Sequence, residues 1–258
     1  MKKTNTDLIK IYDAVHAADK KFFTVPPIEE SIEIFKEIKD WNNLRVLEIG
    51  CGLGDLAAMV AKAGASKVVA CDYSKSSIQK AKETYVLHNL EYICDDFNNL
   101  HFSEKFDIII LQGVLEHFDR PWKSLKYIIE NFLNDSGTVI NSCPAFYNPR
   151  GYIWMTLQLL FDVPMSLTDL HFLDIHDFKK FTSQNNLNLS WRSIHNSWGC
   201  GVGLVNDYKK RLNNALRDAN LSNKNVDKLL DWVLESSPYF VKNNDSGACV
   251  IYKIKKLK

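Results

Sequence analysis

The chain has 258 residues, of which 46% are hydrophobic and 24% charged, and its formal net charge at pH 7 is +1. A chain of this length and composition can bury a sizeable core, and we expect a single globular domain. The near-neutral charge, with one short basic run at 253–258, argues against general nucleic-acid binding. No run of about 18 apolar residues occurs and no secretory h-region opens the sequence, so we predict a cytoplasmic protein that does not bind membranes.

The six cysteines form no C-x-x-C pair and lie mostly in apolar runs. Such placement favours reduced core residues over disulfides or a zinc site. We therefore expect neither a disulfide framework nor a bound metal.

Residues 7–40 carry apolar side chains at helical spacing, interrupted by Pro26 and Pro27. This pattern predicts two helices ahead of the first strand. The segment 12–23 has two readings: a lid over a binding site, or a helix that packs on the sheet. The sequence leaves both open.

Residues 46–56 read as a buried strand, a glycine-rich turn and the start of a helix. Gly50, Gly52 and Gly54 alternate, so the backbone can take positive φ and approach a ligand closely. A dinucleotide fingerprint needs a glycine at position 55, where this chain has Asp55, and the strand also carries an acid, Glu48. The turn therefore favours a cationic ligand over a pyrophosphate.

The second strand, predicted at 67–71, ends at Asp72, 20 residues after Gly52. In nucleotide-binding α/β folds a carboxylate at about this spacing accepts hydrogen bonds from ribose hydroxyls. A helix cap is the competing role for Asp72. Because Ser76 and Gln79 form a capping box of their own, we favour ribose binding.

The third and fourth strands, predicted at 90–94 and 106–111, also end in polar residues. The third is followed by Asp95 and Asp96, and the fourth by Gln112. Parallel strands bind ligands at their carboxyl ends. We therefore expect Asp96 and Gln112 to share one crevice with Gly50 and Asp72.

Beyond the fourth strand, the pattern predicts a helix at 122–133 opened by Pro121, and a fifth strand at 138–141 that follows Gly137. Residues 143–175 are irregular and rich in aromatic residues, which predicts a substrate cap whose apolar faces can bury only against the site below or a partner chain. A helix at 177–185, a sixth strand at 187–194, two helices within 206–236 and a last strand at 248–255 complete the prediction.

Residues 44–142 contain, in order, V-L-E-I-G-C-G-L-G, V-V-A-C-D-Y-S, I-C-D-D-F, F-D-I-I-I-L-Q-G-V-L-E-H and S-G-T-V-I-N-S. This series resembles the class I S-adenosylmethionine-dependent methyltransferases, and the L-E-H triplet with the 171–178 segment is similar to the ubiquinone-type and small-molecule branch. The resemblance implies an α/β fold with a doubly wound, Rossmann-like sheet of seven strands, the last antiparallel. It divides the single domain into N-terminal helices or lid (1–43), cofactor-binding core (44–142), cap (143–176) and C-terminal part (177–258) with a helical insertion (197–246).

The resemblance also implies the cofactor, S-adenosyl-L-methionine, and the residues around it. The expected cofactor-binding residues are Glu48, Gly50, Cys51, Gly52, Gly54, Asp72, Tyr73, Asp95, Asp96, Phe97 and Gln112. The expected catalytic candidates are His117, His171 and His176, with Tyr147 as a further candidate.

We expect the acceptor to be a small metabolite hydroxyl, deprotonated by His117 as general base. The other reading of His117 is a loop cap that never touches substrate. N-methylation of a small amine and a non-catalytic, cofactor-binding subunit are the alternative functions. A nucleic-acid methyltransferase is disfavoured because N-P-P-Y, D-P-P-Y and a Pro-Cys pair are absent after strand four; a homodimer is left open.

Overall fold

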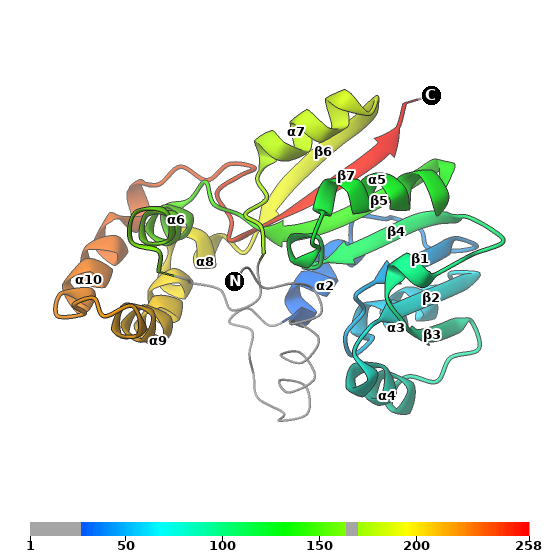
Figure 1. The fold of residues 1–258 in the computed structure, drawn as a ribbon, viewed down its shortest axis with the longest axis horizontal. Helices are drawn as coiled ribbons and strands as arrows, with labels where there is room; N and C mark the ends of the chain where they lie inside the picture. The colour runs from blue at the N-terminus through cyan, green and yellow to red at the C-terminus, as the bar shows by residue number, and fades with distance from the viewer. Residues whose placement is uncertain (1–26, 164–169, 258) are drawn as a thin grey trace. The chain divides into compact units, whose positions relative to one another are not determined.

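The computed structural model describes residues 27–163 and 170–257 of the chain. They contain one seven-stranded sheet of order β3-β2-β1-β4-β5-β7-β6, with the last strand antiparallel to the others (Figure 1). The strands are β1 (Arg45–Ile49), β2 (Lys67–Asp72), β3 (Leu90–Cys94), β4 (Phe106–Gln112), β5 (Leu133–Pro144), β6 (Leu187–Ile194) and β7 (Cys249–Lys256). The predicted fold class is confirmed.

The helices alternate with the strands through the first half of the chain, as a doubly wound sheet requires. The α-helices are α2 (Pro27–Phe35), α3 (Asp55–Lys62), α4 (Lys75–Thr84), α5 (Pro121–Asn131), α6 (Pro149–Phe161), α7 (Ile175–Gln184), α8 (Asn196–Cys200), α9 (Val202–Asp218) and α10 (Val226–Ser236). Three short 3₁₀ helices are η1 (Phe97–Asn99), η2 (Leu115–His117) and η3 (Ser237–Tyr239). The first predicted helix and the segment 12–23 lie outside the described residues.

Strands β1 and β4 form the centre of the sheet because their sequences are apolar on both faces. Parallel pairing sets Val46 beside Ile108 and Ile49 beside Leu111, and all four side chains are buried. A continuous apolar run is typical of a parallel strand covered on both faces. This buried pair fixes where the glycine turn after β1 and the polar residues after β4 emerge.

The chain forms two compact units. The first, here called the core unit, comprises Met1–Cys143, Ile175–Ser190 and Tyr252–Lys258, and the second unit comprises Pro144–Asp174 and Trp191–Ile251. Within the core unit, aromatic residues of α5, α7 and β7 pack together: Trp122 meets Phe178 edge-on at 5.1 Å between ring centroids, and Phe178 stacks on Tyr252 at 3.8 Å.

The second unit has its own hydrophobic cluster. Phe146 and Trp154 from the aromatic segment pack with Tyr208 of α9 and Leu230 of α10, all of them buried. We expected this segment to bury its apolar faces only against the site or a partner chain. That expectation is wrong for these two aromatic residues, because α9 and α10 provide the apolar surface.

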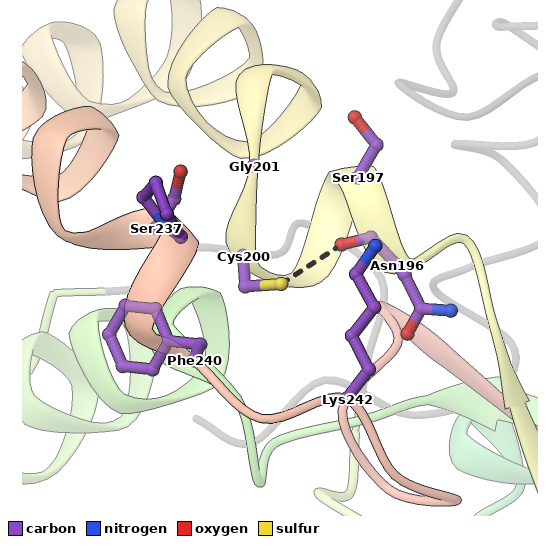
Figure 2. A pocket seen from close by; sticks show the side chains of 8 residues that line it. Asn196, Ser197, Cys200, Gly201, Ser237, Phe240 and Lys242 are labelled. Atoms are coloured by element: carbon purple, nitrogen blue, oxygen red, sulfur yellow. Dashed lines mark hydrogen bonds between the residues drawn. The ribbon is translucent and has the colours of Figure 1, made fainter.

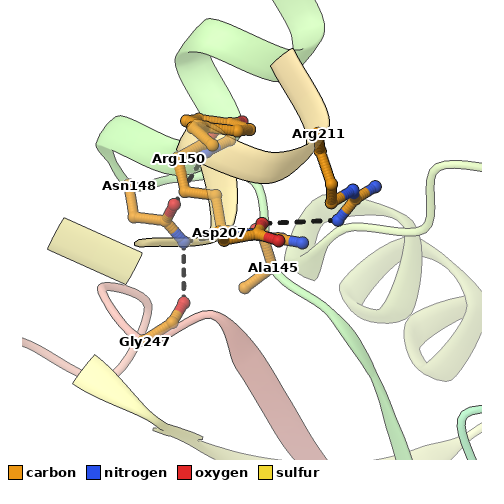
Figure 3. Close-up of polar contacts among 8 residues, drawn as sticks. Ala145, Asn148, Arg150, Asp207, Arg211 and Gly247 are labelled. Carbon is orange, nitrogen blue, oxygen red and sulfur yellow. Dashed lines mark hydrogen bonds and ion pairs between the residues drawn. The ribbon is translucent and has the colours of Figure 1, made fainter. Parts of the chain in front are cut away.

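Helix α6 itself corrects the prediction of an irregular segment at 143–175. The side chain of Asn148 accepts a hydrogen bond from the N–H of Gly151, and Pro149 occupies the first helical position. Asn148 also donates to the carbonyl of Gly247 (Figure 3). The residues that begin α6, Asn148 as N-cap and Pro149 at the first position, could therefore be read from the sequence. The apolar residues after them are not spaced as on one face of a helix.

An ion cluster joins α6 to α9 inside the second unit. The fully buried Asp207 accepts at Oδ2 from Arg150 Nε at 3.4 Å and from Arg211 Nη1 at 3.3 Å (Figure 3). Both guanidinium groups lie over the ring of Trp154, 4.8 and 5.2 Å from its centroid. Cation–π and ionic contacts thus hold the two helices together.

Strand β5 begins at Leu133, five residues before its predicted start, so Gly137 lies inside the strand. The pairing with β4 shifts register between Phe106 and Ile108. A side chain at Gly137 would come within 3.0 Å of the carbonyl oxygen of Asp107, so this irregular pairing requires glycine. Gly137 therefore marks the irregular part of β5, and not a turn ahead of the strand.

None of the helices in the described ranges is both long and apolar enough to cross a membrane. The six cysteines, all within the described residues, are not joined in disulfides; five of them are buried and Cys94 is exposed.

Candidate cofactor site

The glycine turn after β1 takes the backbone shape that its sequence predicts. Gly50, Gly52 and Gly54 all have positive φ, at 74°, 51° and 80°. A side chain at Gly50 would collide with Val114, and one at Gly54 would approach the Tyr92 hydroxyl to 2.5 Å. A Cβ at Gly52, however, would meet no atom of the described residues within 4 Å. A side chain would therefore clash at either end of the turn, at Gly50 or Gly54, whereas the space beside Gly52 is open.

Asp72 ties this open turn to the end of β2. Its Oδ2 accepts from the N–H of Gly52 at 2.9 Å, and its Oδ1 accepts from the N–H of Ser74 at 2.8 Å. The backbone repeats the connection, because the N–H groups of Gly50 and Cys51 both donate to the carbonyl of Cys71. Asp72 therefore holds the middle of the turn and the start of the next helix through its two carboxylate oxygens.

The N-cap of α4 corrects one step of the argument for Asp72. Ser74, and not Ser76, caps this helix by accepting from the N–H of Ser77. Gln79 donates to Glu83 and so does not close a capping box. Since Asp72 accepts from the N–H of Ser74, it supports the helix entry and holds Gly52 at the same time.

Glu48 adds a buried carboxyl beneath the turn, with 2% of its surface exposed. Burial raises the pKa of this carboxyl from 4.5 to about 8. A hydrogen bond from the backbone N–H of Ala57 opposes the shift, and the charges of Asp55 and Asp72 add to it. The negative potential at the turn comes from Asp55 and Asp72, because Glu48 is neutral near pH 7 and adds no charge. This potential repels a phosphate and attracts an ammonium or sulfonium group.

The first turn of α3 carries a partial positive charge, opposite in sign to the charge of the acids. Gly54 is its N-cap residue and has no side chain to satisfy the free N–H groups of that turn. The N-terminus of a helix is a favourable place for a carboxylate. A zwitterionic amino-acid group is therefore well matched to the glycine turn, with its cation toward the acids and its carboxylate toward α3.

The third strand brings Asp95 and Asp96 to the same end of the sheet. The N–H of Asp95 donates to the carbonyl of Asp72 at 3.1 Å, so the two strand ends are joined. Asp96 caps η1 by accepting from the N–H of Asn98, and Phe97 is buried against Phe118 with centroids 4.5 Å apart. Tyr73 follows Asp72 directly and is half-buried.

The fourth strand ends beside β1, since Leu111 pairs with Ile49. Gln112 accepts at Oε1 from the Ser31 hydroxyl of α2 at 2.9 Å. His117 ends η2 five residues later; its backbone N–H donates to the carbonyl of Val114, and the residue is half-buried. Its neighbour Glu116 is buried.

The three candidate histidines do not fall in one unit. His117 and His176 belong to the core unit, His176 at the second position of α7. His171 and Tyr147 belong to the second unit, where the Tyr147 hydroxyl donates to Asp174 at 2.7 Å. The structure therefore bonds the glycine turn to the end of β2 and Asp95 to Asp72, and leaves the cofactor contacts and the catalytic roles of the histidines as predictions.

Sequence reasoning missed three polar residues around the turn: Ser74, Tyr92 and Glu116. The hydroxyl of Tyr92 is buried without a hydrogen-bond partner in the described part of the chain, and burial raises its pKa. Each of the three lies within four residues of a strand end. That position was the signal by which they could have been found.

Residues 46–137 match the family model of a methyltransferase domain. The core of this chain is a class I S-adenosylmethionine-dependent methyltransferase domain. The match covers β1 to the middle of β5, the part of the chain that contains the glycine turn, Asp72, Asp96 and His117.

Two relatives show how far the similarity reaches. The chain is 30% identical over 150 residues to ubiquinone biosynthesis O-methyltransferase of Neisseria meningitidis, covering 55% of this chain and 59% of the relative. It is 38% identical over 114 residues to a Methanocaldococcus jannaschii protein provisionally named a protein N5-glutamine methyltransferase, covering 43% and 56%. The chain thus spans less than two thirds of either relative.

Solved structures share the fold at low sequence identity. The complex of the Haloferax volcanii Trm112 methyltransferase activator with a methyltransferase contains a chain that matches with a TM-score of 0.65 at 13% identity, covering 96% of this chain and 98% of that one. At this level of identity the match establishes the fold of the methyltransferase domain and no more.

Proposed function

We propose that this protein transfers a methyl group from S-adenosyl-L-methionine to a small-molecule acceptor. The observation that carries the proposal is the open space beside Gly52, whose N–H is bonded to Asp72 and which lies two residues before the N-cap of α3. A cofactor that ends in a zwitterionic amino acid next to a sulfonium fits the carboxylates of Asp55 and Asp72 and the N-terminus of α3. A dinucleotide does not, because its pyrophosphate would face these two carboxylates.

Each predicted cofactor residue then has a distinct role. Asp72 accepts hydrogen bonds from the ribose hydroxyls, in addition to those that it accepts from the N–H groups of Gly52 and Ser74. Asp96, with Asp95 as the alternative, accepts from the adenine amino group. Further contacts come from the glycine turn and its neighbours: Glu48, Gly50, Cys51, Gly54, Tyr73, Phe97 and Gln112.

The proposal is tested first by cofactor binding. In Gly52→Val, the branched side chain occupies the space beside the turn, and calorimetry should detect no binding of S-adenosylmethionine or S-adenosylhomocysteine. Gly52→Ala adds one methyl group to the same space and should weaken binding less. Thermal unfolding controls for the strain that positive φ puts on either variant. Unchanged affinity in a folded Gly52→Val protein would refute the site.

Methyl transfer is an in-line displacement in which the acceptor forms a bond to the methyl carbon while the carbon–sulfur bond breaks. The electron pair of the broken carbon–sulfur bond goes to sulfur, and the leaving group is S-adenosylhomocysteine. For a hydroxyl acceptor we propose that His117 takes the proton, a step typically worth about 10² to 10⁴ in rate. The core-unit His176 and the second-unit His171 are the alternative bases.

Methylation of nitrogen is the second candidate, and the similarity to the protein provisionally named a protein N5-glutamine methyltransferase supports it. A neutral amine can attack without a general base, so this reaction depends on orientation alone. Release of S-adenosylhomocysteine, measured against a panel of hydroxyl and amine acceptors, separates the two chemistries. If the cofactor binds and no acceptor turns over, the non-catalytic alternative is favoured.

A further inference from the structure

The second unit contains a cavity of about 360 Å³ between α8, η3 and the loop that follows η3 (Figure 2). Pockets that bind small molecules begin at roughly this size. The side chains that line it and matter to its chemistry are Asn196, Ser197, Cys200, Ser237, Phe240 and Lys242. This cavity belongs to the second unit alone and takes no residue from the glycine turn.

Lys242 is the single charged residue among those that line the cavity. Its ammonium group makes no ion pair with any residue in the ranges 27–163 and 170–257. Other lysines of the chain do have acid partners, such as Lys253 with Glu37 at 2.8 Å. The cavity therefore carries a positive charge that the described protein does not neutralise.

The neutral polar groups of the lining add donors to this charge. Asn196 uses its Oδ1 to accept from Ser246, which leaves the two N–H groups of its amide for another acceptor. The Ser197 oxygen accepts from the N–H of Gly203 at 3.2 Å, so its O–H is also left to donate. An ammonium, an amide and a hydroxyl that all donate are complementary to an anion.

The rest of the lining is apolar or already satisfied. Phe240 contributes an aromatic ring, the Cys200 thiol donates to the carbonyl of Asn196, and the Ser237 hydroxyl donates to the carbonyl of Leu234. The loop that carries Lys242 is held in place, since Asn243 and Ser246 bond to each other and Ser246 bonds to Asn196. The cavity thus has a built polar side and an apolar side.

We propose that this cavity binds a small anion that carries a carboxylate or phosphate group beside an apolar portion. The anionic group faces Lys242 and the amide of Asn196, and the apolar portion lies against Phe240. The inference is independent of methyl transfer, because its residues lie outside the cofactor site and its test needs no cofactor.

The test uses the full chain without cofactor, titrated by calorimetry with benzoate, phenyl phosphate and the neutral benzyl alcohol. We expect at least one of the two anions to bind and benzyl alcohol to bind more weakly. Lys242→Gln keeps the length of the side chain and removes its charge, which should raise the Kd of the anion by roughly 10-fold or more. Lys242→Arg, which keeps the charge, should bind within a few-fold of the wild type.

Lys209→Gln is the matched control, because Lys209 is an exposed lysine on α9 of the same unit that does not line the cavity. It should leave the Kd unchanged. Tighter benzoate identifies a carboxylate ligand, and tighter phenyl phosphate a phosphorylated one; either supports the site. Three results would overturn the site. They are an equal loss of affinity in Lys242→Gln and Lys209→Gln, an affinity for benzyl alcohol equal to that for the anions, and no binding of either anion up to about 10 mM.

Discussion

Replacement of Glu48 by glutamine tests whether the acid beneath the glycine turn is neutral at physiological pH. The pKa of this carboxyl rises from 4.5 in the unfolded chain to about 8 in the folded protein, because burial disfavours its charged form. Between these two values the folded protein keeps a proton that the unfolded chain releases. Its contribution to stability is therefore complete below pH 4.5 and is lost as the pH rises toward 8.

The size of the effect follows from the width of that window. Each pH unit inside it changes the free energy of unfolding by about 1.4 kcal/mol per proton. From pH 5 to pH 7 the wild-type protein should therefore lose about 2 to 3 kcal/mol of stability from Glu48 alone. Glutamine cannot ionise, so Glu48→Gln should not show this loss, and its advantage over the wild type should grow with pH.

Urea unfolding of the cofactor-free protein at pH 5, 6 and 7 measures both curves. Glu83→Gln, which changes an exposed carboxyl of α4, is the control and should run parallel to the wild type. If Glu48→Gln also runs parallel, Glu48 is ionised in the folded protein. Burial would then not keep this carboxyl neutral, and the argument from its raised pKa would be wrong.

Three further substitutions test other parts of the molecule. Asp72→Ala should weaken cofactor binding by about 1 to 3 kcal/mol in calorimetry, and an unchanged Kd would argue against ribose contact. His117→Ala should lower kcat by at least about 10²-fold while cofactor affinity is kept. If kcat is unchanged in this variant and also in His171→Ala and His176→Ala, histidine is not the base. Asp207→Ala leaves two guanidinium groups without their shared buried carboxylate and should destabilise the protein by about 3 to 5 kcal/mol in urea unfolding, whereas a change below about 1 kcal/mol would mean that the ion cluster is not structural.

Local sequence signals predicted most of the core unit. The alternating glycines predicted the turn at 50–54, and the apolar runs predicted β3 and β6 at the bounds that the structure shows. Asp72, Asp96 and Gln112 could be predicted to lie at one edge of the sheet because the carboxyl ends of parallel strands share that edge.

Helix α6 of the second unit was harder to predict because it does not follow the usual periodicity. It buries Trp154 but exposes Tyr152, Leu159 and Phe161, so its apolar residues do not mark one face.

At α4, in the core unit, the sequence offers Ser74, Ser76 and Ser77 as caps, and the capping-box rule chose Ser76. The N–H of Ser74 bonds to the side chain of Asp72, two residues earlier, and the Ser74 side chain caps the helix. Three closely spaced serines can all act as caps, and the capping-box rule alone does not decide between them.

The position of β7 has a consequence for how the protein is made. This strand is synthesised after the other six, yet it lies between β5 and β6 and pairs with both. Until residues 249–256 have left the ribosome, β5 has a partner only on its β4 side and β6 has none, so the nascent chain presents bare sheet edges. A product that stops before Cys249 also lacks Tyr252, whose ring stacks on Phe178. Termination of synthesis before Cys249 should therefore yield a protein that aggregates and is degraded, even though every residue of the proposed cofactor site has been translated.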